Sequence, residues 1–307
     1  MTSAYIKYLK PFDYIFVLRP MLHLPVWTIL ILGYYSGSFG QDHRWELLSA
    51  LLIGTGLFGA VFLINQIYDI ESDRINDKLH FLPRGYIKVP VAWAMTIGLN
   101  IISLIGAFAI SIQIGLIAAM VVILGIIYSA PPLILKDRAW SATIANGLGH
   151  GTLVYLLGFC TAGGEIAVGI VKSLPYFFAV AAVYIGTTLP DIDGDKSTGK
   201  LTIGVRYGQN LTIYIIMIIY ILAIASGYIV GDRLFLYAAL AAAPIYIRAL
   251  FARSIRAIVN AVKVSIITLT LAAIYQAPLY LLFFVALVFA TRAYYKARFD
   301  MVYPSIS

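Results

Sequence analysis

The stretch VPVAWAMTIGLNIISLIGAFAISIQIGLIAAMVVILGIIYSAPPLIL, residues 89–135, contains no Asp, Glu, Lys or Arg. A helix crosses the apolar part of a bilayer in about 20 residues, so this run is long enough for two crossings. The whole chain of 307 residues is 61% hydrophobic and only 12% charged, with a mean hydropathy of +0.90. The composition therefore predicts an integral membrane protein.

Similar apolar segments recur along the chain and predict an all-α, multi-pass membrane protein. The segment 257–274 is ambiguous because Lys263 interrupts it, so the sequence predicts nine spans with a tenth left open. We expect residues 1–307 to form a single integral-membrane domain. The nine expected spans are 14–35, 47–68, 89–110, 112–130, 140–162, 170–190, 209–230, 234–252 and 275–294.

The net charge of +8 comes from basic residues that lie between apolar segments, which is typical of a topology signal and excludes a nucleic-acid-binding surface. The loops after the second, fourth and sixth spans are rich in Lys and Arg, and therefore predict a cytoplasmic face in the cell membrane. With nine spans, the basic residues 292–298 would lie on the opposite face. A tenth span would bring them to the basic face.

The first acidic motif, Asn65-Gln-Ile-Tyr-Asp69-Ile-Glu-Ser-Asp73-Arg74, ends the second span. A spacing of four puts Asn65, Asp69 and Asp73 on one face of a helix, so that their oxygens can converge. A solvated helix end would also contain acids. However, Asn65 and Asp69 directly continue an apolar run, where acidic groups are costly and usually functional.

The second acidic motif, Asp191-Ile-Asp193-Gly-Asp195-Lys196-Ser-Thr-Gly-Lys200, follows the sixth span. Two clusters of hard oxygen ligands on one membrane face suit Mg²⁺, with Mn²⁺ as a possible substitute. Basic residues are interleaved with these acids, namely Arg74, Lys78 and Arg84 in one loop and Lys196 and Lys200 in the other. A diphosphate leaving group would be stabilised by both the metal and the basic side chains. A cation conduit would gain nothing from the basic side chains.

These paired motifs resemble those of UbiA-type intramembrane prenyltransferases, and the similarity extends over most of the chain. Arg19-Pro20 is similar to an early Arg-Pro element of the family. Tyr128-Ser129-x-Pro131-Pro132-x-x-x-Lys136 is similar to its segment after the fourth span. Two features depart from the family pattern: Pro83-Arg84, where the two residues appear in reversed order, and the C-terminal extension TRAYYKARFDMVYP.

The resemblance implies an all-α bundle closed around a central cavity, with the two acidic motifs at its cytoplasmic mouth. It also implies an enzyme that transfers a prenyl group from a prenyl diphosphate to an aromatic or other lipophilic acceptor, as in lipid or quinone biosynthesis. The implied metal ligands are Asn65, Asp69, Asp73, Asp191 and Asp195. The implied catalytic residues are Asp69, Asp191, Lys136 and Tyr128, and the implied substrate-binding residues are Asn65, Arg74, Arg138, Lys200, Arg19 and Asn146.

An allylic cation would be stabilised by aromatic faces, for which Tyr68 and Tyr128 are the candidates. Asn146 and His150 lie four residues apart, and we expect them either to contact the acceptor or to make ordinary interhelical hydrogen bonds. The alternative functions are a phosphotransferase of the CDP-alcohol type and a cation-coupled transporter. Asp193-Gly194 lacks the Ala-Arg that the phosphotransferase signature requires. The acids cap helices, whereas a transporter would place them at mid-span.

Overall fold

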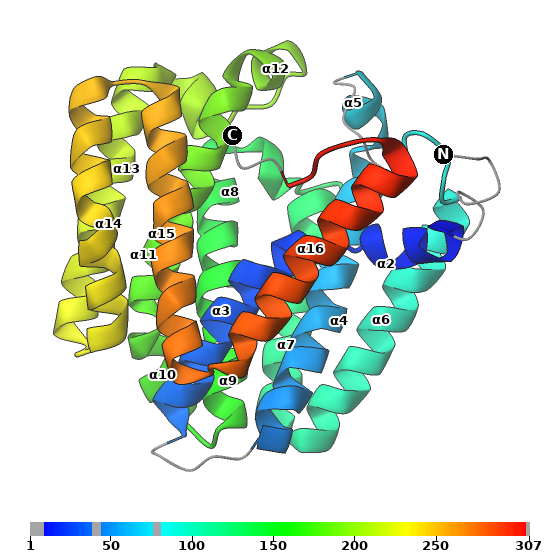
Figure 1. Ribbon diagram of the computed structural model, residues 1–307, viewed down its shortest axis with the longest axis horizontal. Helices are drawn as coiled ribbons and strands as arrows, with labels where there is room; N and C mark the ends of the chain where they lie inside the picture. The colour runs from blue at the N-terminus through cyan, green and yellow to red at the C-terminus, as the bar shows by residue number, and fades with distance from the viewer. Residues whose placement is uncertain (1–8, 39–43, 76–80, 305–307) are drawn as a thin grey trace.

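A computed structural model describes residues 9–38, 44–75 and 81–304. Within these ranges the chain is helical, apart from turns and one isolated bridge between Arg138 and Leu201. Long helices stand side by side in Figure 1. They are α3 (Pro20–Gly37), α4 (Arg44–Tyr68), α6 (Val89–Ile110), α7 (Ile112–Ser129), α11 (Leu174–Thr188), α13 (Ile203–Ile229), α14 (Arg233–Ala252), α15 (Ile255–Gln276) and α16 (Leu279–Phe299).

Shorter helices connect or interrupt the long ones. Three of them, α8 (Ala139–Asn146), the π-helix η3 (Gly147–Leu153) and α9 (Val154–Thr161), form one continuous helical run. The others are η1 (Lys10–Phe12), α2 (Asp13–Phe16), α5 (Ile70–Ile75), η2 (Leu135–Asp137), α10 (Ile166–Lys172), η4 (Leu189–Asp191) and α12 (Ile192–Ser197).

The predicted all-α membrane fold is confirmed. Eight helical segments of the described chain are long and apolar enough to cross a bilayer, and a ninth is formed if α10 and the helix after it, bent by 43°, count as one span. Large apolar side chains face outward, as at Ile102, Ile229 and Phe283. In water such exposure would be costly, but lipid accepts it.

The ambiguous segment 257–274 lies within α15, a separate helix of 22 residues. As a result, α16 ends at the same end of the bundle as α5 and α12 (Figure 1). The basic residues near the C-terminus therefore lie on the basic face.

Two expected spans are interrupted. The first breaks before α3, because Arg19 adopts a left-handed conformation (φ 54°) and Pro20 starts the next helix without an amide N–H. A left-handed non-glycine residue costs about 1–2 kcal/mol. The span expected over 170–190 instead bends at Ser173, between α10 and α11.

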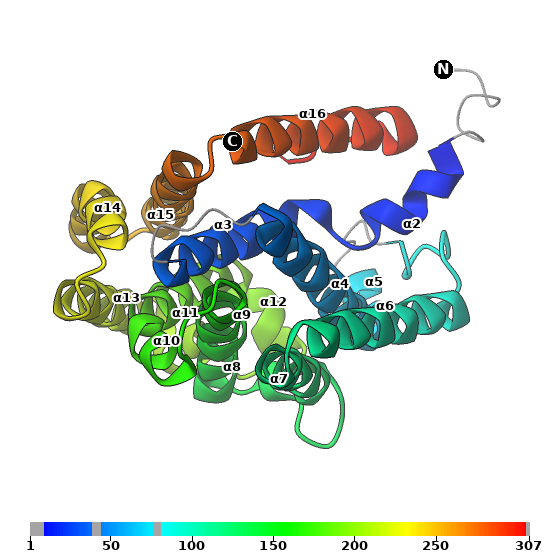
Figure 2. The same cartoon turned by 90° about the horizontal axis from the view of Figure 1, so that it is seen from below.

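Viewed along the bundle, α3, α4, α7, α8, α9 and α11 surround the middle (Figure 2). Outside them, α13 lies between α11 and α14, α15 lies beside α14, and α16 crosses outside α3. Helices α3 and α9 approach each other closely. A Cβ atom on Gly158 would lie 2.1 Å from the carbonyl oxygen of Leu30, and one on Gly33 would lie 2.3 Å from that of Tyr155. Small residues at such crossings allow the tight packing on which membrane helices depend.

Candidate active site

The first acidic motif continues the helical path of α4 into α5. The Asp69 amide donates to the Asn65 carbonyl oxygen (3.0 Å), and the Asp73 amide donates to the Asp69 carbonyl oxygen (2.8 Å). The three side chains therefore lie one turn apart, as the spacing predicts. Asn65 is half-buried, and Asp73 is buried.

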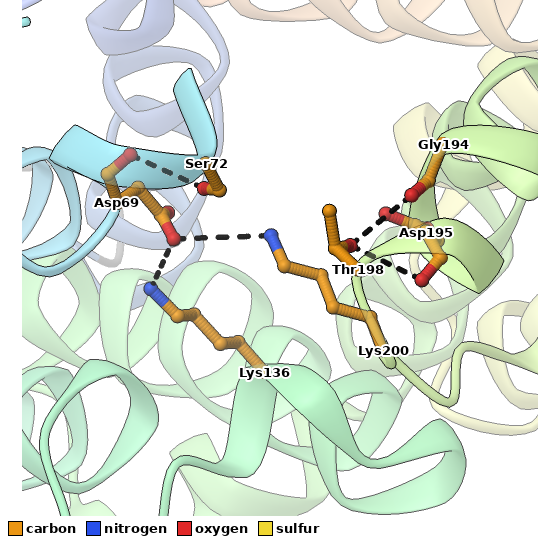
Figure 3. A network of polar contacts seen from close by, with 7 residues as sticks. All are labelled: Asp69, Ser72, Lys136, Gly194, Asp195, Thr198 and Lys200. Carbon is orange, nitrogen blue, oxygen red and sulfur yellow. Dashed lines mark hydrogen bonds and ion pairs between the residues drawn. The ribbon is translucent and has the colours of Figure 1, made fainter. Parts of the chain in front are cut away.

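Asp69 is contacted by lysines from two other segments (Figure 3). The Lys136 ammonium, at η2, donates to Asp69 Oδ1 at 2.7 Å, and the Lys200 ammonium, beyond α12, lies 3.8 Å from the same oxygen. The Lys136 side chain is 9% exposed, that of Asp69 15% and that of Lys200 25%. Charges this sheltered from water interact more strongly than surface charges.

The second acidic motif forms η4, α12 and the turn that follows them. The Thr198 hydroxyl donates to the carbonyl oxygens of Gly194 and Asp195, and the Lys200 amide donates to the Asp195 carbonyl oxygen at 2.9 Å. These bonds fix the turn from which Lys200 reaches toward Asp69 (Figure 3). The Asp195 side chain is half-buried, and that of Asp191 is exposed.

The loop after α7 is joined to the loop after α12. The Leu201 amide donates to the Asp137 carbonyl oxygen at 3.0 Å, within the bridge between Arg138 and Leu201. The backbone of one loop therefore sets the position of the other. This connection holds Lys136 and Lys200 at a fixed separation over Asp69.

The predicted metal ligands supply only oxygen, the donor type that Mg²⁺ prefers. Within the described ranges, however, no three Asp, Glu, His or Cys side chains lie close enough together to hold a metal ion. Asp69 faces lysines, and Asp191 is open to solvent. The donor chemistry therefore fits Mg²⁺, but the carboxylates do not form a closed site, and further ligands such as phosphate oxygens are required.

A cavity of about 400 Å³ lies inside the bundle and contains four of the predicted substrate-contacting residues in its wall: Arg19, Asn65, Tyr128 and Asn146. The Asn146 amide donates to the Tyr128 hydroxyl at 3.1 Å. Aromatic and aliphatic side chains complete the wall, among them Phe58, Phe62, Val61, Val121, Leu124 and Tyr184.

Neither the cavity wall nor the ion pairs of Asp69 include the predicted residues Arg74, Arg138 and Tyr68. Arg74 and Arg138 are exposed, and neither contributes to the cavity wall. Tyr68 is 42% exposed and packs edge-on against Trp93, so the expectation that its ring faces an allylic cation is wrong. Asn65, three residues earlier on α4, lines the cavity instead.

Sequence inspection gave no role to Asp137 or Tyr184. Asp137 Oδ1 is buried without a hydrogen-bond partner among the described residues. Tyr184 lines the cavity together with Tyr128 and Asn146. The only sequence signal for Asp137 was its position beside Lys136. Nothing in the sequence distinguishes Tyr184 from the other tyrosines, of which the chain contains 22 in all.

Comparison with known proteins relates the chain to prenyltransferases. It is 28% identical over 193 residues to the chloroplastic chlorophyll synthase of Arabidopsis thaliana, covering 60% of this chain and 50% of that protein. It is 26% identical over 209 residues to the digeranylgeranylglyceryl phosphate synthase of Methanosphaera stadtmanae, covering 68% of this chain and 74% of that protein. The match therefore spans only half of the plant enzyme.

Solved structures show the same fold at low sequence identity. A UbiA homologue from Archaeoglobus fulgidus bound to DMAPP and Mg²⁺ superposes with a TM-score of 0.71 at 23% identity, covering 86% of this chain and 98% of that one. A UbiA homologue from Aeropyrum pernix K1 gives a TM-score of 0.68 at 16% identity, covering 83% and 98%. The model of the UbiA prenyltransferase family matches residues 26–261, and this chain belongs to that family.

Proposed function

We propose that the protein transfers a prenyl group from an isoprenoid diphosphate to a lipophilic acceptor in a Mg²⁺-dependent reaction. One observation carries the proposal: Asp69 is faced by Lys136 and Lys200 at the end of α4, and Asn65, one turn earlier, lines the cavity of about 400 Å³. A charged end next to an apolar interior matches the two ends of a prenyl diphosphate. The names of the relatives support this assignment.

The charged end would bind the diphosphate. Lys136, Lys200 and Arg19 supply the nearest cations, and the exposed Arg74 and Arg138 add positive charge at the rim. Mg²⁺ would be held by Asn65, Asp69, Asp73, Asp191 and Asp195, and when bound it would stabilise the negative charge of the leaving diphosphate. The DMAPP and Mg²⁺ in the Archaeoglobus homologue support this choice, and we propose Mn²⁺ as a substitute.

The apolar cavity would hold the prenyl chain. Lys136 and Lys200 would stabilise the charge that develops on the diphosphate as its bond to the prenyl carbon breaks. The faces of Tyr128 and Phe62 would stabilise the allylic cation through cation–π attraction. Asn146 donates to the Tyr128 hydroxyl and so holds the ring in place, while the aliphatic wall excludes water that would otherwise capture the cation.

The site is proposed to open toward the cytoplasm from the cell membrane, within one domain formed by the whole chain. The higher content of Lys and Arg in the loops on this face supports that orientation. The acceptor is proposed to reach the cavity as a membrane-dissolved molecule, since the outward surface of the bundle is apolar.

The test is turnover with and without metal. Purified protein is incubated with geranylgeranyl diphosphate and a panel of lipophilic acceptors, and the products are identified by mass spectrometry. We expect EDTA to abolish transfer and Mg²⁺ to restore it, because the proposed ligands are all oxygens. Full activity in excess chelator would exclude the metal-dependent mechanism.

A further inference from the structure

A second cavity, of about 260 Å³, adjoins the first. It extends between α3, α11, α13, α14 and α15, and it shares six wall residues with the first cavity: Leu22, Pro25, Asn146, His150, Tyr184 and Thr187. The shared residues form a junction at which a molecule in one cavity meets a molecule in the other. Four of the six have polar side chains.

The wall of the second cavity contains no Asp, Glu, Lys or Arg. Its hydroxyl groups are largely engaged within the protein. The Tyr220 hydroxyl donates to the Ala239 carbonyl oxygen, the Ser265 hydroxyl donates to that of Tyr246 at 3.2 Å, and Thr28 and Thr270 bond each other. A charged group placed here would lose its hydration without gaining a counter-ion, which is a large cost. The second cavity therefore selects a neutral molecule.

His150 is the junction residue whose side chain can accept a proton near neutral pH. It lies on η3, the π-helical turn that interrupts an otherwise α-helical run, and such turns occur frequently at functional sites. Its ring packs against Phe58 (centroids 4.9 Å apart) and Phe62 (6.0 Å). In the described part of the chain neither ring nitrogen forms a hydrogen bond. A neutral imidazole retains one nitrogen as an acceptor, so the ring can accept a hydrogen bond from a molecule in the cavity.

We propose that the second cavity binds a neutral, lipophilic acceptor carrying a hydroxyl group, and that His150 is the base that removes the hydroxyl proton. This inference rests on the proposed prenyl transfer and adds the chemical class of the acceptor. Asn146 and Thr187, which also line the junction, orient the hydroxyl oxygen. The acceptor oxygen then faces the first cavity, where the allylic cation of the prenyl group forms.

The step balances without a further reactant. The bond between the prenyl carbon and the diphosphate oxygen breaks, and its electron pair leaves with the diphosphate. A lone pair of the acceptor oxygen forms the new carbon–oxygen bond. The hydroxyl proton moves to the free ring nitrogen of His150, which later releases it to water. The products are a prenyl ether, diphosphate and a proton.

The first test uses matched acceptors that differ in charge. With geranylgeranyl diphosphate and Mg²⁺, wild-type protein is given dioleoylglycerol against oleoyl glycerol phosphate, and 1,4-naphthalenediol against 1,4-dihydroxy-2-naphthoate. We expect products from a neutral member and at least tenfold less from its anionic partner. Equal or faster transfer to an anionic member would overturn the inference, as would the absence of transfer to both neutral members by protein that binds the diphosphate.

The second test substitutes His150 with Gln, which keeps a polar side chain but cannot act as a base. We expect kcat to fall about 100-fold or more, the usual contribution of a general base, with the KM for geranylgeranyl diphosphate unchanged. Leu148→Ala is the control, since Leu148 lies on the same π-helical turn and is 40% exposed on the outer surface. Wild-type kcat in His150→Gln would refute the role of His150.

Binding of radiolabelled geranylgeranyl diphosphate separates this inference from the function on which it rests. Wild-type protein that fails to bind the diphosphate in the presence of Mg²⁺ would contradict the proposed function itself. Protein that binds it, but prefers anionic acceptors or tolerates His150→Gln, would contradict only the acceptor class and the base.

Discussion

Two ion pairs that are sheltered from water, Asp13–Arg298 and Asp69–Lys136, each connect distant parts of the chain. They differ in how the two carboxylate oxygens are used. Asp13 of α2 accepts from Arg298 of α16 on both oxygens, from Nε at 3.0 Å and from a terminal nitrogen at 3.0 Å, and also accepts from the Tyr294 hydroxyl. Asp69 meets both of its cations, Lys136 and Lys200, on the single oxygen Oδ1.

The difference separates a structural contact from a binding site. The Asp13 pair is bidentate and surrounded by aromatic rings, including a stack of Phe16 on Tyr294 with centroids 3.7 Å apart. Three of the roughly four acceptor sites of the Asp13 carboxylate are already used within the protein, on both of its oxygens. Asp69 instead has an excess of positive charge around it and lies one turn beyond a cavity-lining residue. An anion that enters there can bind the two lysines in place of Asp69. We therefore expect the Asp13–Arg298 pair to determine the stability of the protein, and Asp69 with its lysines to determine turnover.

The largest effect is expected from Asp69→Asn. The amide keeps the shape but loses the charge, so it cannot balance two lysines or bind a cation as strongly. Turnover should fall by about 1,000-fold or more, because charge stabilisation of the leaving group is lost. Steady-state rates measured by product mass spectrometry give the comparison.

The combination with Asp191→Asn tests whether both acidic motifs serve one site. Residues that act as a unit are strongly non-additive, so the double variant should be little slower than Asp69→Asn alone. Losses that multiply would indicate two separate sites.

The next largest effect is expected from Arg298→Gln, and it should appear in stability. Removing one partner of a buried pair costs about 3–5 kcal/mol, because the Asp13 carboxylate is left uncompensated. The Tm in detergent should fall, while kcat per folded molecule remains that of the wild type. Lys296→Gln is the control, since its pair with Asp300 is exposed and should leave the Tm unchanged. A catalytic defect in folded Arg298→Gln would remove the distinction between the two pairs.

Lys136→Gln should show the opposite behaviour. If Lys136 contacts the diphosphate, its loss should raise the barrier by about 2–4 kcal/mol, the usual cost of removing one preorganised charge contact. Diphosphate binding should weaken, and the KM for the acceptor should stay constant. Wild-type kinetics would mean that Lys136 only anchors the membrane face, as positive residues commonly do.

The family, the all-α membrane fold and the one-turn spacing of Asn65, Asp69 and Asp73 could be predicted from the sequence. Charge-free runs define membrane helices because the bilayer rejects charge, and a spacing of four fixes which side chains share a helical face. The alternatives of a phosphotransferase and a transporter gain no support from the comparisons, which relate the chain to prenyltransferases.

Features that depend on tertiary packing could not be predicted in this way. The bend at Ser173, the π-helical turn around His150 and the partnership of Lys136 with Asp69 arise where helices meet, and no local pattern encodes them. Tyr68 is a candidate for stabilising the allylic cation by sequence, but its ring packs against Trp93. Adjacent residues on a helix point in directions about 100° apart, so proximity in sequence was misleading there.

The smallest effect is expected from Lys200→Gln. This variant tests whether the distance from Asp69 and the exposure to water predict which of the two lysines contributes more to catalysis. The Lys200 ammonium lies 3.8 Å from Asp69 Oδ1 and its side chain is 25% exposed, whereas Lys136 donates at 2.7 Å and is 9% exposed. Coulomb attraction weakens with distance and with access to water, so we expect about a tenfold loss of kcat/KM for Lys200→Gln. Lys196→Gln provides the control, because Lys196 is exposed on α12 and should be silent. If Lys200→Gln is as slow as Lys136→Gln, Lys200 must move toward the diphosphate when the substrate binds, and the loop after α12 is then part of the closed site.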